Sequence, residues 1–126
     1  MMTGPQPRVL ADRLVLIVED QYLIADDMRL MVERLGGRVL GPVSRVPTAI
    51  AALAGERPDL ALLDVNLDGE DVYAVADALR SAAVPFLFTT GYDSWTIDPR
   101  FSAAPHLEKP IAMPALMSAL RDLDLA

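Results

Sequence analysis

Cysteine is absent from this chain of 126 residues, and histidine, lysine and tryptophan occur only once each. The lack of cysteine excludes a disulfide framework, a thiolate metal site and a cysteine nucleophile. A single histidine excludes the usual metal centres built from several imidazole groups. A metal site in this chain would therefore depend on oxygen ligands.

Basic residues are also few, since 11 lysines and arginines stand against 18 aspartates and glutamates and leave a net charge of −7. Nucleic acid and anionic membranes need a basic face, so neither is expected as a direct partner. No run approaches the roughly 18 apolar residues that span a bilayer. The first residues lack the cationic and then apolar pattern of a signal peptide. We therefore expect a cytoplasmic protein, of a length that suits one domain.

Apolar residues make up 52% of the chain and fall into short runs and helical stripes. Uninterrupted apolar runs predict strands that are buried on both faces, as in a parallel sheet. An apolar period of about 3.6 residues predicts amphipathic helices. The predicted strands are 14–18, 39–43, 60–63, 84–88 and 106–108, and the predicted helices are 22–35, 47–53, 72–79 and 113–123.

The alternation of strand and helix predicts a doubly wound α/β domain over residues 13–124, preceded by a flexible N-terminal extension over residues 1–12. Parallel strands need crossover helices, and right-handed crossovers place helices on both faces of the sheet. Residues 92–104 show no convincing period and contain Pro99. The helix expected there is therefore short or absent.

Polar residues follow four of the five predicted strands at their carboxyl ends. They are Glu19 and Asp20 after the first strand, Asp64 after the third, Thr90 after the fourth and Lys109 after the fifth. The carboxyl ends of parallel strands converge at one edge of the sheet, where ligands bind. Taken singly, each residue has an ordinary explanation, because acids cap helices and threonine is common in loops.

Taken together, these residues indicate a cation site that also binds phosphate. Three carboxylates crowded at one edge repel one another unless a cation lies among them. Oxygen ligands without histidine or cysteine select Mg²⁺ or Mn²⁺, and Mg²⁺ keeps coordination positions for phosphate oxygens. Lys109 is the only lysine, and it is the natural point charge for a phosphoryl group.

In this order and on these elements, the residues resemble the receiver domain of two-component response regulators, from about residue 13 to residue 123. The resemblance implies a five-stranded, flavodoxin-like parallel sheet of strand order 2-1-3-4-5. It also implies that Asp64 accepts a phosphoryl group from a phosphohistidine, which a sensor histidine kinase or a phosphotransfer protein would carry.

The resemblance further implies roles for the residues around the phosphoacceptor. Thr90 and Lys109 would bind the phosphoryl oxygens and draw the loop after the fourth strand inward. That movement would bias a two-state surface, which an unknown downstream protein would read. The implied ligands of Mg²⁺ are Glu19, Asp20, Asp64 and the main-chain carbonyl of Asn66.

Two regions depart from the pattern of the family. His106 stands three residues before the lysine, where many receivers carry Tyr or Phe, so it is either a modified switch residue or a partly exposed packing residue. The stretch 88–92 is similar to the Phe-Ala-Thr-Gly-hydrophobic-Tyr motif of a single-domain receiver subgroup, with Thr89 in place of its Ala and Asp93 in place of its Tyr. In that subgroup the following helix is reduced or mobile, which agrees with the weak helical signal in residues 92–104.

Three functions are compatible with these residues. The first is a phosphoacceptor switch without an output domain of its own, which signals through protein contacts or drains phosphate from a kinase. The second is a degenerate receiver that serves only as an interaction module. The third is a phosphohydrolase of the haloacid-dehalogenase type with Asp64 as nucleophile. That chemistry usually needs an acid two residues later, where this chain has Asn66.

Overall fold

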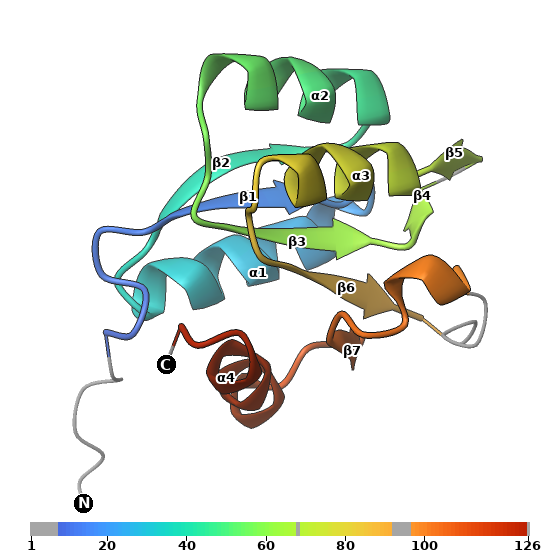
Figure 1. The fold of residues 1–126 in the computed structure, drawn as a ribbon. Helices are drawn as coiled ribbons and strands as arrows, with labels where there is room; N and C mark the ends of the chain where they lie inside the picture. Colours follow the sequence, from blue (N-terminus) through green and yellow to red (C-terminus); the bar gives the residue numbers. More distant parts are fainter. Residues whose placement is uncertain (1–7, 68, 92–96, 126) are drawn as a thin grey trace, which may run out of the picture.

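A five-stranded parallel sheet with helices on both faces forms the computed structural model, which describes residues 8–67, 69–91 and 97–125 (Figure 1). The strand order is β2-β1-β3-β6-β7, and all four pairings are parallel. The flavodoxin-like order 2-1-3-4-5 predicted for the main strands is therefore confirmed. These strands are β1 (Leu14–Val18), β2 (Arg38–Val43), β3 (Leu60–Asp64), β6 (Phe86–Thr90) and β7 (His106–Glu108).

Helices α2 and α3 lie on one face of the sheet, and α1 and α4 lie on the other (Figure 1). Successive strand residues point to opposite faces. Leu63 and Phe88 accordingly join the core under α2 and α3, whereas Leu62 and Leu87 join the core under α1 and α4. No helix of the described residues is long and apolar enough to cross a membrane. The α-helices in those residues are α1 (Tyr22–Arg34), α2 (Val46–Gly55), α3 (Tyr73–Ser81) and α4 (Met113–Asp122).

The edge strand β2 pairs irregularly with β1 near the position of Glu19. Gly41 has φ +103°, and a Cβ there would lie 2.7 Å from the main-chain nitrogen of Val43. Only glycine therefore fits this backbone. The pairing of β1 with β2 shifts register between Leu16 and Val18. The main-chain N–H of Glu19 then donates to the Val43 carbonyl at 2.9 Å, which ties the end of β1 to β2.

The end of the N-terminal segment packs against the domain. Leu10 is fully buried in the core under α1, and its N–H donates to the Leu35 carbonyl at 2.9 Å. Leu10, which lies within the extension predicted over residues 1–12, thus packs beside the end of α1. Residues 1–7 lie outside the described residues.

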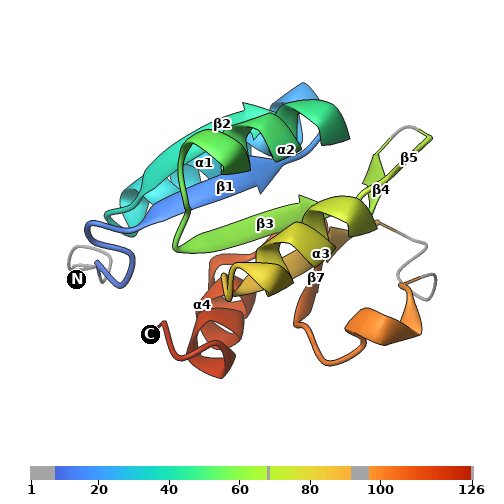
Figure 2. The ribbon, with the colours of Figure 1, turned by 45° about the horizontal axis from the view of Figure 1, so that its top comes forward.

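The connection between β6 and β7 ends in a 3₁₀ turn, Pro99–Phe101 (orange in Figure 2). Residues 97–104 contain no α-helix, in agreement with the weak sequence signal, and residues 92–96 lie outside the described part of the chain. Phe101 is fully buried. Its ring stacks on Tyr73 with centroids 5.4 Å apart and meets Phe88 edge-on at 5.9 Å. Phe101 thus joins the 3₁₀ turn to the aromatic part of the core beside α3.

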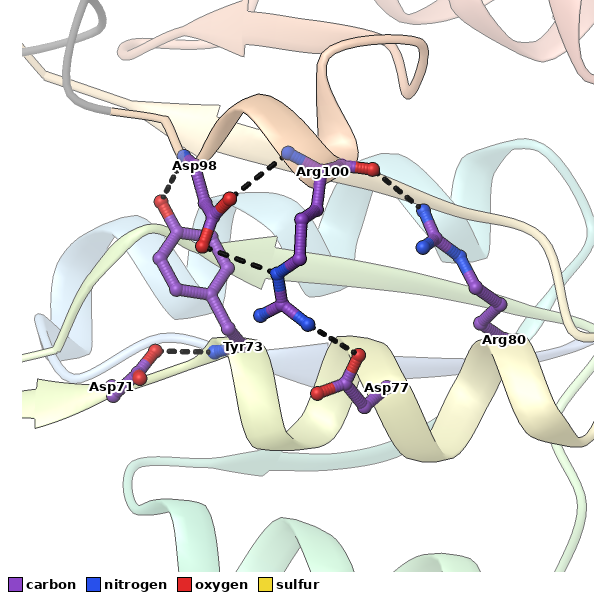
Figure 3. A network of polar contacts seen from close by, with 6 residues as sticks. All are labelled: Asp71, Tyr73, Asp77, Arg80, Asp98 and Arg100. Carbon is purple, nitrogen blue, oxygen red and sulfur yellow. Dashed lines mark hydrogen bonds and ion pairs between the residues drawn. The ribbon is translucent and has the colours of Figure 1, made fainter.

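Polar contacts with α3 fix this turn in place (Figure 3). The N–H of Asp98 donates to the Tyr73 hydroxyl at 2.8 Å. The Asp98 carboxylate accepts from the N–H of Arg100 at 2.9 Å. Arg80 donates to the Arg100 carbonyl at 3.1 Å, and the Arg100 guanidinium lies 3.4 Å from the Asp77 carboxylate. Bonds from both ends of the turn therefore anchor it to one helix.

Candidate functional site

Three acids meet at the carboxyl ends of β1 and β3, which are neighbouring strands of the sheet. Glu19, Asp20 and Asp64 each offer a carboxylate oxygen within 4.8 Å of the others. Glu19 and Asp64 are buried, with 2% and 1% of their surfaces exposed. Asp20 lines an open cleft. Residues 45 positions apart thus form one acidic cluster, as the strand-end pattern predicted.

Lys109 comes into this cluster from the other side, after the end of β7. Its N–H donates to the Thr90 carbonyl at 2.8 Å, which holds the chain beside β6. Its Nζ lies 2.9 Å from Oε1 of Glu19 and 3.1 Å from Oδ1 of Asp64. Burial disfavours the charged ammonium, but the bonds to the two carboxylates outweigh burial and keep the pKa of Lys109 above its usual value.

The two oxygens of Asp64 have different surroundings. Oδ1 accepts the main-chain N–H of Asn66 at 3.0 Å and contacts Lys109. Oδ2 is buried and has no hydrogen-bond partner among the described residues. Burial raises the pKa of Asp64 to about 7, and Glu19 adds to the rise, whereas the Asn66 N–H and Lys109 lower the pKa.

The cluster fits a hard divalent cation. Its donors are all oxygens, which suit Mg²⁺ or Mn²⁺. A buried carboxylate oxygen without a partner is costly, and Oδ2 of Asp64 is such an oxygen. Asn66 also lines the cleft, which makes its main-chain carbonyl a candidate for a further ligand. Glu19, Asp20, Asp64 and Asn66 are therefore the groups that could hold the ion.

Thr90 lies at the edge of this arrangement, whereas His106 stands apart from it. Thr90 is 2% exposed at the end of β6, and its hydroxyl donates to the Leu107 carbonyl over a long distance of 3.4 Å. His106 is exposed on β7. It lines a groove beside α4 together with Ala115 and Ser118. The structure therefore places the main chain of Thr90 beside Lys109, which carries the ammonium of the cluster, and it places His106 in a separate groove.

The sequence did not predict a small hairpin that follows Asp64. Strand β4 (Asn66–Leu67) pairs antiparallel with β5 (Glu70–Asp71). The carboxylate of Glu70 accepts the N–H of Val46 at 3.1 Å and pairs with Arg45 at 2.9 Å. The hairpin is thus bound to the start of α2. Its only signal in the sequence is the Asp-Gly pair at 68–69, a common hairpin turn.

Known proteins match both the sequence and the structure. A family model described as the response regulator receiver domain matches residues 15–121. The phyllosphere-induced regulator PhyR of Methylorubrum extorquens is 44% identical over 82 residues, which are 62% of this chain and 30% of that protein. The positive alginate biosynthesis regulatory protein of Pseudomonas aeruginosa is 34% identical over 112 residues, which are 85% of this chain and 45% of that protein. The chain thus spans less than half of the length of these curated relatives.

Solved structures extend the likeness over nearly the whole domain. The solution structure of SdrG from Sphingomonas melonis Fr1 is 39% identical, with a TM-score of 0.81 over 91% of this chain and 97% of that chain. A second SdrG structure, described as its BeF3-activated conformation, is 38% identical with a TM-score of 0.77 over 90% of this chain and 97% of that chain. The receiver match over residues 15–121 excludes the haloacid-dehalogenase alternative. With its sheet order, its strand-end acids and these matches, the chain belongs to the response-regulator receiver family.

Proposed function

We propose that this receiver accepts a phosphoryl group on Asp64 in a reaction that depends on Mg²⁺ or Mn²⁺. The observation that carries the proposal is the state of the Asp64 carboxylate. One oxygen is held by a main-chain N–H and Lys109, and the other is buried without a partner among the described residues. Such a carboxylate is held at one oxygen and still has lone pairs on the other oxygen for a cation and for phosphorus.

The chemistry that the chain's residues support is phosphoryl transfer to a carboxylate. An oxygen of Asp64 attacks the phosphorus of a phosphohistidine, an O–P bond forms, and the P–N bond breaks with its electron pair leaving on the imidazole. Lys109 offers N–H donors to the transferred oxygens, because its Nζ already lies beside Asp64. When bound, the divalent cation supplies positive charge that stabilises the phosphoryl oxygens.

Thr90 is the residue that we expect to report phosphorylation to the rest of the domain. Its hydroxyl makes only a long bond to the Leu107 carbonyl, so exchanging that bond for a phosphoryl oxygen costs little. A shift of Thr90 would move the end of β6 and the chain that follows it. The resulting change of surface is the signal that a downstream protein would bind.

Partners and turnover follow from the same proposal. SdrG, whose structure this chain covers to 97%, has been solved in a BeF3-activated conformation. By likeness, we expect this chain to be phosphorylated by a sensor histidine kinase or a phosphotransfer protein. We then expect it to act through protein contacts or as a phosphate sink. We expect the chain to catalyse its own phosphorylation and dephosphorylation and to turn over no separate substrate.

The proposal is tested by intact mass after incubation with acetyl phosphate and Mg²⁺. We expect a single species heavier by about 80 Da, which is the mass of one phosphoryl group, and its loss when EDTA replaces Mg²⁺. A folded protein that never gains this mass would support the interaction module instead. Steady release of phosphate from many monoesters would contradict the expectation of no separate turnover.

Mg²⁺ affinity should rise with pH. The pKa of Asp64 is raised to about 7, so below that pH a proton occupies the carboxylate and competes with the cation. Below pH 7, we expect the affinity for Mg²⁺ to decrease by up to about tenfold for each pH unit, and above pH 8 we expect it to be constant. Calorimetric titration of Mg²⁺ at pH 6, 7 and 8 measures this. An affinity that is the same at pH 6 and pH 8 would contradict it.

A phosphodonor protein is expected to dock beside the cleft at the start of α1. Tyr22 and Leu23 are 79% and 76% exposed there, and the adjacent Gln21 and Ile24 line the cleft. Large apolar side chains with this exposure next to a reactive site suit a protein contact. We therefore expect Leu23→Asp to slow phosphotransfer by about tenfold or more.

The measurement uses the autophosphorylated sensor kinase that labels the wild-type chain fastest. Leu30→Asp is the matched control, because Leu30 is exposed on the same helix about two turns away. Labelling by acetyl phosphate should be equal in all three proteins, since this small donor needs no docking. If Leu23→Asp and Leu30→Asp slow the kinase reaction equally, the docking site lies elsewhere.

A further inference from the structure

The side-chain hydroxyl of Thr89 is buried and makes no hydrogen bond to any described residue. The residue is fully buried in β6, and its Oγ1 has no hydrogen-bond partner in the part of the chain that the structure describes. A buried hydroxyl without a partner costs free energy, and such groups are rare in folded proteins. An alternative partner in another state of the site would explain why a hydroxyl is present here.

The register of the sheet places Thr89 directly beside Asp64. The two residues are partners in the parallel pairing of β3 with β6. Two positions earlier on each strand, Leu62 and Leu87 both belong to the core under α1 and α4. Because side chains alternate along a strand, Asp64 and Thr89 face the same side of the sheet. Neighbouring strands lie about 4.8 Å apart, so the two side chains are within reach of each other.

The two side chains also have complementary unused groups. Oδ2 of Asp64 is buried and unpartnered among the described residues, and so is Oγ1 of Thr89. A threonine hydroxyl donates one hydrogen bond, and an ionised carboxylate oxygen only accepts. A change of the threonine side chain between staggered χ1 rotamers redirects its hydroxyl without moving the backbone.

We propose that Thr89 is a positioning residue of the phosphoacceptor, whose hydroxyl turns to donate to Oδ2 of Asp64 during phosphoryl transfer. This inference rests on the proposed function. The Asn66 N–H holds Oδ1 of Asp64, so a second donor on Oδ2 stops rotation of the carboxylate plane. Oδ2 then keeps one lone pair for the cation or for phosphorus, whereas Oδ1 already contacts both Asn66 and Lys109. Thr89 therefore acts on the orientation of the nucleophile, separately from Thr90, whose hydroxyl contacts β7.

Two substitutions separate the hydroxyl of Thr89 from its bulk. Thr89→Val keeps the shape and removes the hydroxyl, and Thr89→Ser keeps the hydroxyl. With acetyl phosphate and Mg²⁺, we expect Thr89→Val to lower the rate constant of phosphorylation by about tenfold, the effect of one hydrogen bond to a charged group. Thr89→Ser should stay within about twofold of wild type. The melting temperature of Thr89→Val without metal should equal or exceed that of wild type, because the change removes an unpaired buried hydroxyl.

The NMR three-bond couplings of the Thr89 side chain report its χ1 rotamer independently of any reaction. We expect one rotamer in the metal-free protein and another after addition of Mg²⁺ and beryllofluoride. Equal rates for Thr89→Val and wild type, equal losses in the Val and Ser variants, or an unchanged rotamer would each overturn the inference. Failure of wild type to be phosphorylated would instead overturn the proposed function.

Discussion

Asp64→Asn should abolish phosphorylation completely, so that no species heavier by about 80 Da appears with acetyl phosphate and Mg²⁺. The amide has nearly the shape of the carboxylate but lacks its nucleophilic oxygen. The fold should persist, since burial already disfavours the charged form of Asp64 and raises its pKa. Lys109 also keeps its contact with Glu19. Intact mass and a thermal melt of the same sample measure both points.

The matched control for this variant is Asp27→Asn, which removes one exposed acid from α1. We expect it to be phosphorylated as fast as wild type. Peptide mapping of the wild-type phosphorylated species should place the added mass on the peptide that contains Asp64. If Asp64→Asn gains the same mass as wild type, the acceptor is another residue and the proposed mechanism is wrong.

Phe101→Ala should lower the free energy of unfolding by about 3–5 kcal/mol, the usual effect of truncating a fully buried phenylalanine. Phe101 has no exposed surface, and its ring contacts those of Tyr73, Phe86 and Phe88. The guanidinium groups of Arg80 and Arg100 lie 4.4 and 4.9 Å from its centroid. Truncation would therefore open a cavity and remove two cation–π contacts.

Urea denaturation monitored by circular dichroism measures this loss. Phe101→Leu keeps most of the volume and should cost clearly less than Phe101→Ala. Ile50→Ala changes a side chain that is 38% exposed on α2. It should lower the free energy of unfolding by less than Phe101→Leu does. A loss below about 1 kcal/mol for Phe101→Ala would mean that the 3₁₀ turn contributes little to the core.

The parts of the fold that could be predicted are those in which burial leaves a local pattern. All five residues of each of the strands β1, β3 and β6 are buried. The whole of β1, the first four residues of β3 and the first three of β6 therefore appear in the sequence as apolar runs. The cluster of acids was predictable because topology alone brings strand ends together. The hairpin β4–β5 was missed, because strands of two residues are too short to show a period.

Other features depend on contacts between residues far apart in the chain. Leu10 lies in a segment with three prolines or glycines nearby, and only its contact with the end of α1 shows that it is a core residue. Glu70 looks like a surface acid, yet it accepts the N–H at the start of α2. The sequence showed only that Thr89 replaces the alanine of the single-domain receiver motif. Its position beside Asp64 became visible from the pairing of β3 with β6.

Lys109 neutralises part of the negative charge of the acids that it contacts. When ionised, Glu19, Asp20 and Asp64 carry three negative charges, and one ammonium reduces the total to two. One divalent cation neutralises that remainder. Lys109 therefore serves as an internal counter-ion for Glu19 and Asp64, and its N–H groups would be available to an incoming anion once the acids held a cation. The cleft would then exchange ions in a set order, with the metal first and the phosphoryl group second.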